Sequence, residues 1–399
     1  MVDEARDSLE SWREEFPILA HTTYMISNSL GAMPRGAARS LADYAETWAT
    51  RGVRAWEDRW WEMALEVGNR VGAIIGAPAG SVSMHDNVTI AQTAALSCLR
   101  PSGRRRKIVC SAADFPSMVY LYRAQKDLGF ELHVVSAGND LNVTEDHIVA
   151  AVDEETLAVA FSHVLFRTSF IVDPRPVVER ARQVGALSIL DVYQSAGIVP
   201  LDVRGLDVDF ATGGCLKWLC GGPGNGFLYT RPELLRSLTP RFTGWMAMAN
   251  PFAFDIDDTE LREDAMRMMN GTPAIPAYYA AIPGLEVIAE VGVERIRAKS
   301  RRMTARLLER VDRHGWPTIT SRDPERVAGT VAISIPDALP VSRALKARDV
   351  LVDYRPRVGI RVSPHFYNTE AEVDHLVSEL ASIVAAGSYA ATPAASRVT

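Results

Sequence analysis

Short apolar runs recur along the first two thirds of the chain, separated by segments with a helical pattern. Six of these runs have the length and the branched and aromatic content of strands. They cover residues 107–112, 131–136, 158–163, 187–192, 207–211 and 226–230. Segments 37–48 and 60–75 carry apolar residues every three or four positions, as helices that pack on a sheet do. The pattern predicts an α/β fold, with a large domain in which a mostly parallel sheet lies between helices.

The pattern changes after about residue 269. A long helical stretch at 285–311 is followed by shorter strand-like segments at 329–334 and 359–363, which predicts a smaller α+β domain at the C-terminal end. The final residues are rich in Ala, Ser and Thr, as frayed chain ends are. We therefore expect four parts: an N-terminal arm at 1–35, a large domain at 36–268, a small domain at 269–385 and a disordered tail at 386–399.

The chain has 399 residues, of which 47% are hydrophobic and 23% are charged, as in water-soluble globular proteins. The net charge of −6 and the pI near 5.8 argue against nucleic acid or an anionic membrane as the main partner. The first residues are polar and contain no apolar stretch long enough for a signal peptide or a membrane span. We expect a cytoplasmic protein without a nucleic-acid or membrane partner.

Four cysteines are present, and their spacing matches neither a metal site nor a disulfide framework. They are Cys98, Cys110, Cys215 and Cys220. We predict four free thiols and no bound metal.

Lys217 is the residue on which we expect the chemistry to centre. It lies in a run of glycines and apolar residues at 213–227, whereas the other four lysines lie beside arginines or on polar helical stretches. An amine among Leu216, Trp218 and similar neighbours is desolvated, which lowers its pKa and makes it a better nucleophile toward a carbonyl. The alternative is a lysine that extends from the edge of the core toward water, with the glycines serving only a turn.

Asp191 follows the apolar run 186–190, which reads as a buried strand. The carboxyl ends of parallel strands line the ligand crevice of an open α/β sheet, so Asp191 would place an acid there. Such an acid can pair with the protonated ring nitrogen of pyridoxal phosphate and keep the ring an electron sink. Gln194, three residues later, could donate a hydrogen bond to the ring hydroxyl. The alternative for Asp191 alone is a simple helix cap.

Taken in order, these motifs resemble the fold-type-I enzymes that use pyridoxal 5'-phosphate, in the class V aminotransferase superfamily. Within it they are most similar to kynureninases and kynureninase-like proteins. The resemblance implies a large domain whose mostly parallel sheet is of the seven-stranded type. The matching segments span nearly the whole chain: 27–34, 87–89, 114–117, 191–197, 213–227, 244–245, 271–273 and 360–368.

The resemblance implies that pyridoxal 5'-phosphate is bound to Lys217. Asn87, Val88 and Thr89 would start a helix whose terminal amides, with the Thr89 hydroxyl, hold the phosphate. The alternative is an ordinary Asn cap on a core helix.

Three further residues gain roles from the resemblance. Phe115 would stack on the cofactor ring, although a buried structural Phe is the alternative. Thr272 would reach the phosphate in a neighbouring subunit, which implies a homodimer with shared active sites. Trp245 would contact the cofactor and wall the substrate pocket, unless it is only a core residue.

The same resemblance implies how the substrate is held. Arg361 would clamp the carboxylate of an α-amino acid, because a planar guanidinium matches a carboxylate with two parallel hydrogen bonds. It lies in an apolar strand, where an unpaired charge would be costly. The alternative is a structural salt bridge. Asn28 would also contact the substrate.

The family's reactions begin with an external aldimine and a quinonoid, and this chain departs from the kynureninases at three places that govern the later steps. Leu216 stands where they carry a tyrosine, Met118 where they carry an aspartate, and Gln194 where they carry a histidine. We therefore predict a kynureninase-like lyase that breaks a bond at the β-carbon, for example by eliminating the thiol of a cysteine S-conjugate.

Several alternatives remain open. The first is kynureninase itself, which hydrolyses kynurenine to anthranilate and alanine. A class V aminotransferase, a decarboxylation-linked deaminase and an inactive dimeric scaffold are the others. A cysteine desulfurase is disfavoured, because no cysteine follows Pro223 to act as the nucleophile from the smaller domain.

Overall fold

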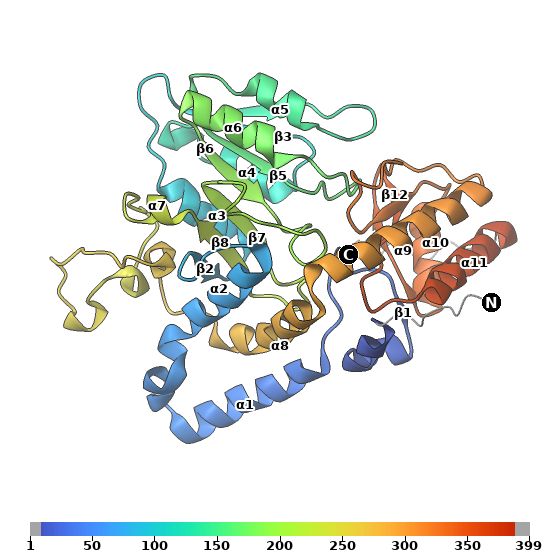
Figure 1. Cartoon of the computed structure of the whole chain (residues 1–399), viewed down its shortest axis with the longest axis horizontal. Coiled ribbons are helices and arrows are strands. Elements are labelled where there is room, and N and C mark those ends of the chain that lie inside the picture. The colour runs from blue at the N-terminus through green and yellow to red at the C-terminus, as the bar shows by residue number, and fades with distance from the viewer. Residues whose placement is uncertain (1–8, 388–399) are drawn as a thin grey trace.

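A computed structural model describes residues 9–387 of the chain (Figure 1). Its largest sheet has seven strands in the order β2-β8-β7-β6-β5-β3-β4. Five of them, β3 to β7, run parallel, while β8 is antiparallel to both β2 and β7. The bounds are β2 Val82–His85, β3 Lys107–Ser111, β4 Glu131–Val135, β5 Thr156–Ser162, β6 Leu187–Asp191, β7 Phe210–Gly214 and β8 Gly226–Thr230.

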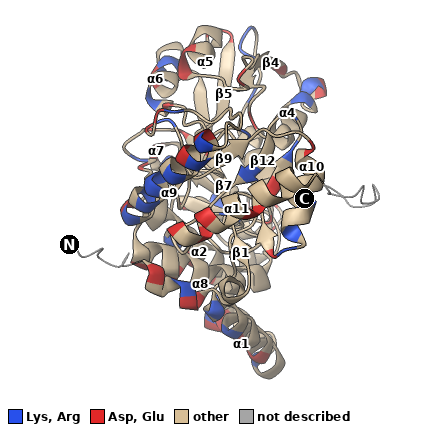
Figure 2. Cartoon of the chain, turned by 90° about the vertical axis from the view of Figure 1, so that its right-hand side faces the viewer, with Lys and Arg blue, Asp and Glu red and all other residues tan. Residues whose placement is uncertain are grey.

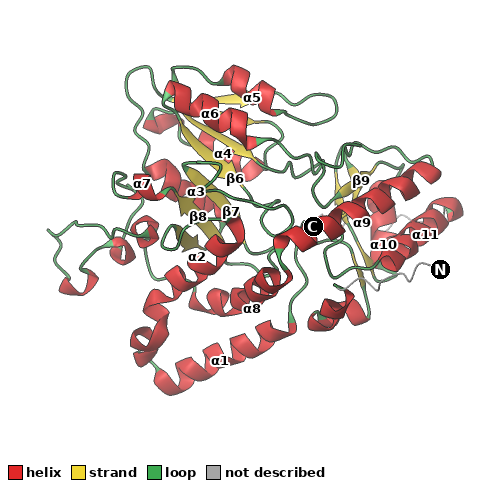
Figure 3. Cartoon of the chain, in the orientation of Figure 1, coloured by secondary structure: helices red, strands yellow, loops and turns green. Residues whose placement is uncertain are grey.

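Helices cover both faces of this sheet, because its strands alternate side chains between two separate cores. Ile108 and Ile189 pack on the side of α3 Val88–Ser97, α4 Pro116–Arg123 and α7 Pro232–Leu235. Val109 and Leu190 pack on the other side. The helices there are α2 Trp61–Ile75, α5 Glu145–Ala151, α6 Pro174–Val184 and α8 Ile275–Val291. The predicted α/β fold is confirmed, and Figure 3 shows strands lying between helices.

A second, smaller body lies at the right of Figure 1 and has its own core. Its antiparallel sheet has the order β11-β12-β9, and its helices pack on that sheet. The bounds are β9 Val331–Ile333, β11 Asp353–Arg355, β12 Gly359–Val362, α9 Val293–Arg313, α10 Ala338–Lys346 and α11 Glu370–Ala386. Figure 2 shows charged residues along α9 and α11, where Arg306 and Arg310 both pair with Asp374.

The segment at 23–34 connects the smaller body to the large sheet. Within it β1 Thr23–Tyr24 pairs with β10 Val350–Leu351 of the smaller body. Gly31 then donates its backbone N–H to the carbonyl of Leu216, beside Lys217, over 2.9 Å. A Cβ on Gly31 would lie 2.1 Å from the carbonyl oxygen of Lys217, so only glycine fits this approach.

Three differences from the sequence prediction affect the large domain and its boundary. The strand expected at 207–211 is β7 at Phe210–Gly214, because Asp207 turns the chain with a φ of +56° and the strand begins only after that turn. The edge strand β2 was not predicted. The long helix expected at 285–311 is two helices, α8 and α9, separated at Gly292 by a φ of +84°.

This break bears on the expected domain division. Helix α8 packs on α2 and on α1 Arg35–Arg51, and its apolar residues belong to the core of the large sheet. The packing therefore favours a boundary at Gly292 over the expected one after residue 268. Of the expected tail, Ala386 is the last residue of α11, and residues 388–399 lie outside the described part of the chain.

Between residues 9 and 387, no helix combines the length with the apolar character required to cross a bilayer. All four cysteines are buried and unpaired.

The approach of Gly31 to Lys217 gives a first prediction. Replacing Gly31 with Ala should lower the free energy of unfolding by about 1–3 kcal/mol, because a methyl group would displace backbone on both sides. Urea denaturation followed by circular dichroism measures this. Gly271→Ala is the matched control, since no atom lies within 4 Å of the added carbon there. Equal stability of the two variants would contradict the close approach.

Candidate active site

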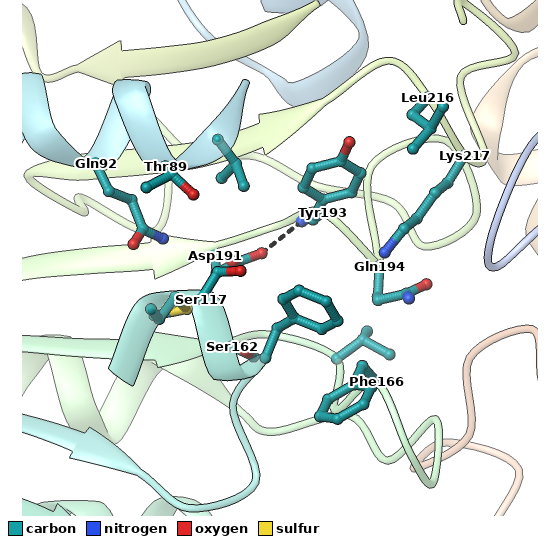
Figure 4. A pocket seen from close by; sticks show the side chains of 14 residues that line it. Thr89, Gln92, Ser117, Ser162, Phe166, Asp191, Tyr193, Gln194, Leu216 and Lys217 are labelled. Atoms are coloured by element: carbon teal, nitrogen blue, oxygen red, sulfur yellow. Dashed lines mark hydrogen bonds between the residues drawn. The ribbon is translucent and has the colours of Figure 1, made fainter. Parts of the chain in front are cut away.

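A cavity of about 200 Å³ opens at the carboxyl ends of β5, β6 and β7, where the sequence placed its candidate residues (Figure 4). Its wall is mainly apolar. It is lined by Val88, Thr89, Gln92, Phe115, Ser117, Met118, Ser162, Val164, Phe166, Asp191, Tyr193, Gln194, Leu216 and Lys217. Six sequence-predicted site residues therefore meet here: Val88, Thr89, Phe115, Asp191, Gln194 and Lys217.

Lys217 lies three residues beyond β7, on the loop that Gly31 contacts. Its Nζ is 4.3 Å from the centre of the Tyr193 ring and 5.8 Å from that of Phe115. Burial lowers the pKa of this amine below the ordinary lysine value, the charge of Asp191 opposes the shift, and that of Arg361 adds to it. The predicted desolvated amine is thus in place, between two aromatic faces.

Asp191 is the last residue of β6 and is only 7% exposed. One carboxylate oxygen, Oδ1, accepts a hydrogen bond from the backbone N–H of Tyr193 over 2.8 Å. Burial raises the pKa of this carboxyl group, while that hydrogen bond and the charge of Lys217 lower it. Asp191 does not cap a helix, so its second oxygen is available to a ligand in the cavity.

The start of α3 forms the opposite wall. The Asn87 side chain accepts a hydrogen bond from the N–H of Ile90 over 3.1 Å, so Asn87 acts as the N-cap and does not itself line the cavity. Val88 and Thr89 follow it and face the cavity. Gly226 permits this position, because a Cβ there would lie 2.4 Å from the Asn87 backbone. Amides at such a helix end attract an anion.

Phe115 is the residue before α4, and it is 44% exposed. The ring packs edge-on against Phe166, with 5.2 Å between ring centres. A purely structural core phenylalanine would be covered on both sides. Phe115 instead presents a face to the cavity, as a ring-stacking residue should.

Gln194 and Asn28 meet beside the cavity. Gln194 donates to the backbone carbonyl of Asn28 over 3.1 Å and accepts from the indole N–H of Trp218 over 3.0 Å. One N–H of its amide is left for a ligand. The Asn28 side chain is buried, and neither its Nδ2 nor its Oδ1 has a hydrogen-bond partner among the described residues. An unpaired buried amide is costly, which is consistent with a ligand contact, and binding of substrate by Asn28 stays a prediction.

Arg361 is more constrained than its predicted role suggests. It lies on β12, almost fully buried, with Nη1 donating to the carbonyl of Phe166 and Nη2 to the carboxylate of Asp353. Its Nε has no partner in the described chain. The structural salt bridge that the sequence left open is therefore present, and binding of a substrate carboxylate by Arg361 remains a prediction.

Trp245 and Thr272 are not brought to the cavity of their own chain. Trp245 is 39% exposed and packs against Trp61 and Phe252, with ring centres 5.1 and 5.6 Å apart. Thr272 is exposed. Contact of either residue with a cofactor would have to be made in another subunit.

Residues that the sequence analysis did not assign complete the wall. Tyr193 lies between Asp191 and Lys217 in Figure 4, and its ring fits because Gly214 has no side chain. Burial raises the pKa of its phenol, which stays protonated. Gln92, Ser117 and Phe166 also line the cavity. Ser117 lies in the first turn of α4 and Phe166 lies in the loop after β5, but Gln92 is in the middle of α3, where no local signal marks it.

Comparison with known proteins identifies what the chain is similar to. The family model described as Aminotransferase class-V matches residues 24–376. A kynureninase of Pseudomonas fluorescens is 31% identical over 397 residues, covering 96% of this chain and 94% of the relative. A kynureninase of Burkholderia pseudomallei strain 1106a is 32% identical, covering 88% and 86%. The uncharacterized aminotransferase YcbU of Bacillus subtilis is 29% identical, covering 94% and 97%.

Solved structures agree on the fold. A cysteine desulfurase of Thermococcus onnurineus matches with a TM-score of 0.84 at 21% identity, covering 96% of this chain and 100% of that one. The cystine C–S lyase C-DES, in complex with cysteine persulfide, matches with a TM-score of 0.83 at 19% identity, covering 92% and 99%.

The lowered pKa of Lys217 gives a second prediction. With any bound aldehyde removed, labelling of Lys217 by an amine-reactive reagent should increase and level off at pH values below 10.5, because the neutral amine is the nucleophile. Mass spectrometry of the labelled peptide at successive pH values measures this. In Asp191→Asn the rise should move to lower pH, since the Asp191 charge raises the pKa of Lys217. Labelling that begins only above pH 10 would contradict the prediction that burial lowers the pKa of Lys217.

Proposed function

The chain belongs to the class-V aminotransferase family of pyridoxal-phosphate-dependent enzymes, and we propose that it is a lyase that cleaves a bond at the β-carbon of an α-amino acid. Elimination of a thiol from a cysteine S-conjugate is the reaction we favour. The observation that carries the proposal is that a desolvated amine, Lys217, and a buried acid, Asp191, line the same mainly apolar cavity.

The residues present fit the cofactor. Asp191 offers a carboxylate oxygen for a protonated ring nitrogen, and Lys217 offers an amine for the aldehyde. The start of α3, with Val88 and Thr89, offers amides for a phosphate. Phe115 offers a face for the ring.

When bound, pyridoxal phosphate supplies an aldehyde that captures an amino group and a ring that withdraws electrons from the α-carbon. The chain's own part is to hold the substrate and to move a proton. Because burial lowers its pKa, the Nζ of Lys217 is a competent base for the α-proton once it is free. The rings of Tyr193 and Phe115 on either side restrict where that amine can move.

The cavity wall favours elimination over hydrolysis. Leu216 and Met118 line it where the kynureninases carry a tyrosine and an aspartate, and Phe166 adds a further apolar surface. Among the described residues that line the cavity, only Asp191, Tyr193 and Lys217 titrate. Hydrolysis of a side-chain ketone needs a group that activates water beside it. Elimination needs only removal of the α-proton and departure of the β-substituent with its bonding electrons.

Kynureninase is the second candidate. The relatives of that name are 31% and 32% identical and align over most of their own length. If the phenol of Tyr193 can perform the proton transfer that Leu216 cannot, hydrolysis of kynurenine remains chemically accessible.

The same proposal includes a homodimer. The segment that carries Trp245 reaches outward at the left of Figure 1 and exposes further apolar side chains. They are Phe252, Phe254 and Ile256, which are 63%, 73% and 92% exposed. Apolar surface of this kind marks an interaction site, and a second copy of the chain would cover it while placing Trp245 and Thr272 near a shared cavity.

A cytoplasmic location also remains a prediction.

The cofactor link gives the third prediction. Protein purified with pyridoxal phosphate should be yellow, and borohydride should fix the cofactor to Lys217 as a secondary amine, because a neutral amine faces the cavity. Peptide mapping after reduction identifies the modified residue. Lys217→Ala should lose the visible band, whereas Lys126→Ala, on an exposed turn away from the cavity, should keep it. Modification of another lysine would contradict the assignment.

Product analysis gives the fourth prediction. Incubation with cysteine S-conjugates should release pyruvate, ammonia and a thiol, because the cavity supports elimination. Anthranilate should form from kynurenine at a rate at least about tenfold lower than the rate of thiol release. The reason is that loss of one side chain that transfers protons slows a reaction by roughly that factor or more. Mass spectrometry identifies the products. Anthranilate as the main product would establish the second candidate, and transfer of an amino group to a keto acid would refute both.

A further inference from the structure

Four arginines lie around Phe166, a residue of the cavity wall, although none of the four is among the described residues that line the cavity. Arg361 bonds to Phe166 and Asp353, and Arg355 donates to the other oxygen of Asp353 over 2.6 Å. The guanidinium of Arg167 lies over the Phe166 ring, 4.8 Å from its centre. Arg357 completes the group, because its positive charge lowers the pKa of Arg167. We call Arg167, Arg355, Arg357 and Arg361 the arginine cluster.

The arginine cluster holds more positive charge than the chain balances. Asp353 is shared by Arg355 and Arg361. Neither Arg167 nor Arg357 forms an ion pair or a side-chain hydrogen bond with any residue in 9–387. Burial lowers the pKa of Arg167, and Arg357 lowers it further. Arg167 is half-buried without an acid to balance its charge, and Arg357, which is exposed, adds a second positive charge near it.

The arginine cluster is part of the surroundings of the cavity. Phe166 lines the cavity and touches Phe115, and its backbone carbonyl is held by Arg361. The charges of Arg361 and Arg355 both lower the pKa of Lys217, so they are within electrostatic reach of it. Figure 4 shows Thr89 and Phe166 on opposite sides of the cavity. An anion at the arginine cluster would therefore be separate from one at the start of α3.

We propose that Arg167 and Arg357 bind a second anionic group, a carboxylate or a similar oxyanion, on the side chain of the substrate. This rests on the proposed function, because it assigns the start of α3 to the cofactor phosphate and Arg361 to the α-carboxylate. The remaining pair of guanidiniums would then bind the end of the substrate beyond the β-carbon, behind Phe166 in the cavity wall. Guanidinium groups suit this task, since their planar donors match a carboxylate with two hydrogen bonds.

The first test compares two substrates that differ in charge and hardly in shape. S-carboxymethyl-L-cysteine carries the second carboxylate, and S-carbamoylmethyl-L-cysteine carries a neutral amide in its place. Elimination from each releases pyruvate, ammonia and a thiol after addition of one water. We expect kcat/KM to be about tenfold or more higher for S-carboxymethyl-L-cysteine than for the amide. A hydrogen bond between charged groups contributes enough binding free energy for a factor of that size.

Variants locate the effect. Arg167→Ala combined with Arg357→Ala should reduce the preference for the acid to about onefold and leave kcat/KM for the amide within about twofold. Arg236→Ala, which removes an arginine with a 76% exposed side chain at the end of α7 that does not line the cavity, is the matched control and should keep the preference. If both substrates lose activity equally in the double variant, the pair binds the α-carboxylate and the proposal is wrong.

A binding experiment separates this proposal from the proposed function. Calorimetry on the purified holoenzyme measures the Kd of glutarate, a dicarboxylate, and of its monoamide, glutaramate. Tighter binding of glutarate in the wild type, lost in the double variant and kept in Arg236→Ala, supports the anion subsite even if neither cysteine conjugate is cleaved. Equal binding of the two probes overturns the anion subsite, even if elimination is observed.

Discussion

The structure depends on holding an amine and a carboxylate in one mainly apolar cavity at the carboxyl edge of a sheet. Burial drives the pKa values of Lys217 and Asp191 toward each other, and the charge of each opposes the shift of the other. Each charge therefore offsets part of the cost of burying the other. The parallel strands place Asp191, and the reversal at β7 and β8 places the lysine loop beside it.

That loop is held from outside the sheet as well. Gly31 contacts the backbone of Lys217 and Leu216, and Ser27 donates to Ser363 of the smaller body. The segment between them also contributes Asn28, whose carbonyl binds Gln194. A movement of the smaller body would therefore reach the lysine loop through residues 27–31. This gives a physical route by which the position of the smaller body can affect the Lys217 amine.

Local sequence patterns were sufficient for the elements that carry the pair. Lys217 was identified by its uncharged neighbours, Asp191 by the apolar strand before it and α3 by its cap, and these signals lie within a few residues of each site. Other features depend on contacts between distant segments. Asp353 forms an ion pair with Arg361, and the ring of Tyr193 packs against Gly214, where a side chain would clash. The positive φ of Gly292 ends one helix and starts another within a continuous helical pattern. No short stretch of sequence contains that information.

Charge around the cavity is arranged differently from charge on the whole molecule. The chain is acidic overall, yet a helix start lines the cavity on one side, and on the other side the arginine cluster lies behind Phe166. Two positive regions separated by a buried amine suit a ligand with negative groups at both ends. A neutral aromatic side chain would leave Arg167 and Arg357 without a counter-charge, whereas an acidic one would remove their mutual repulsion. The electrostatics therefore favour elimination of an acidic β-substituent over hydrolysis of an uncharged one.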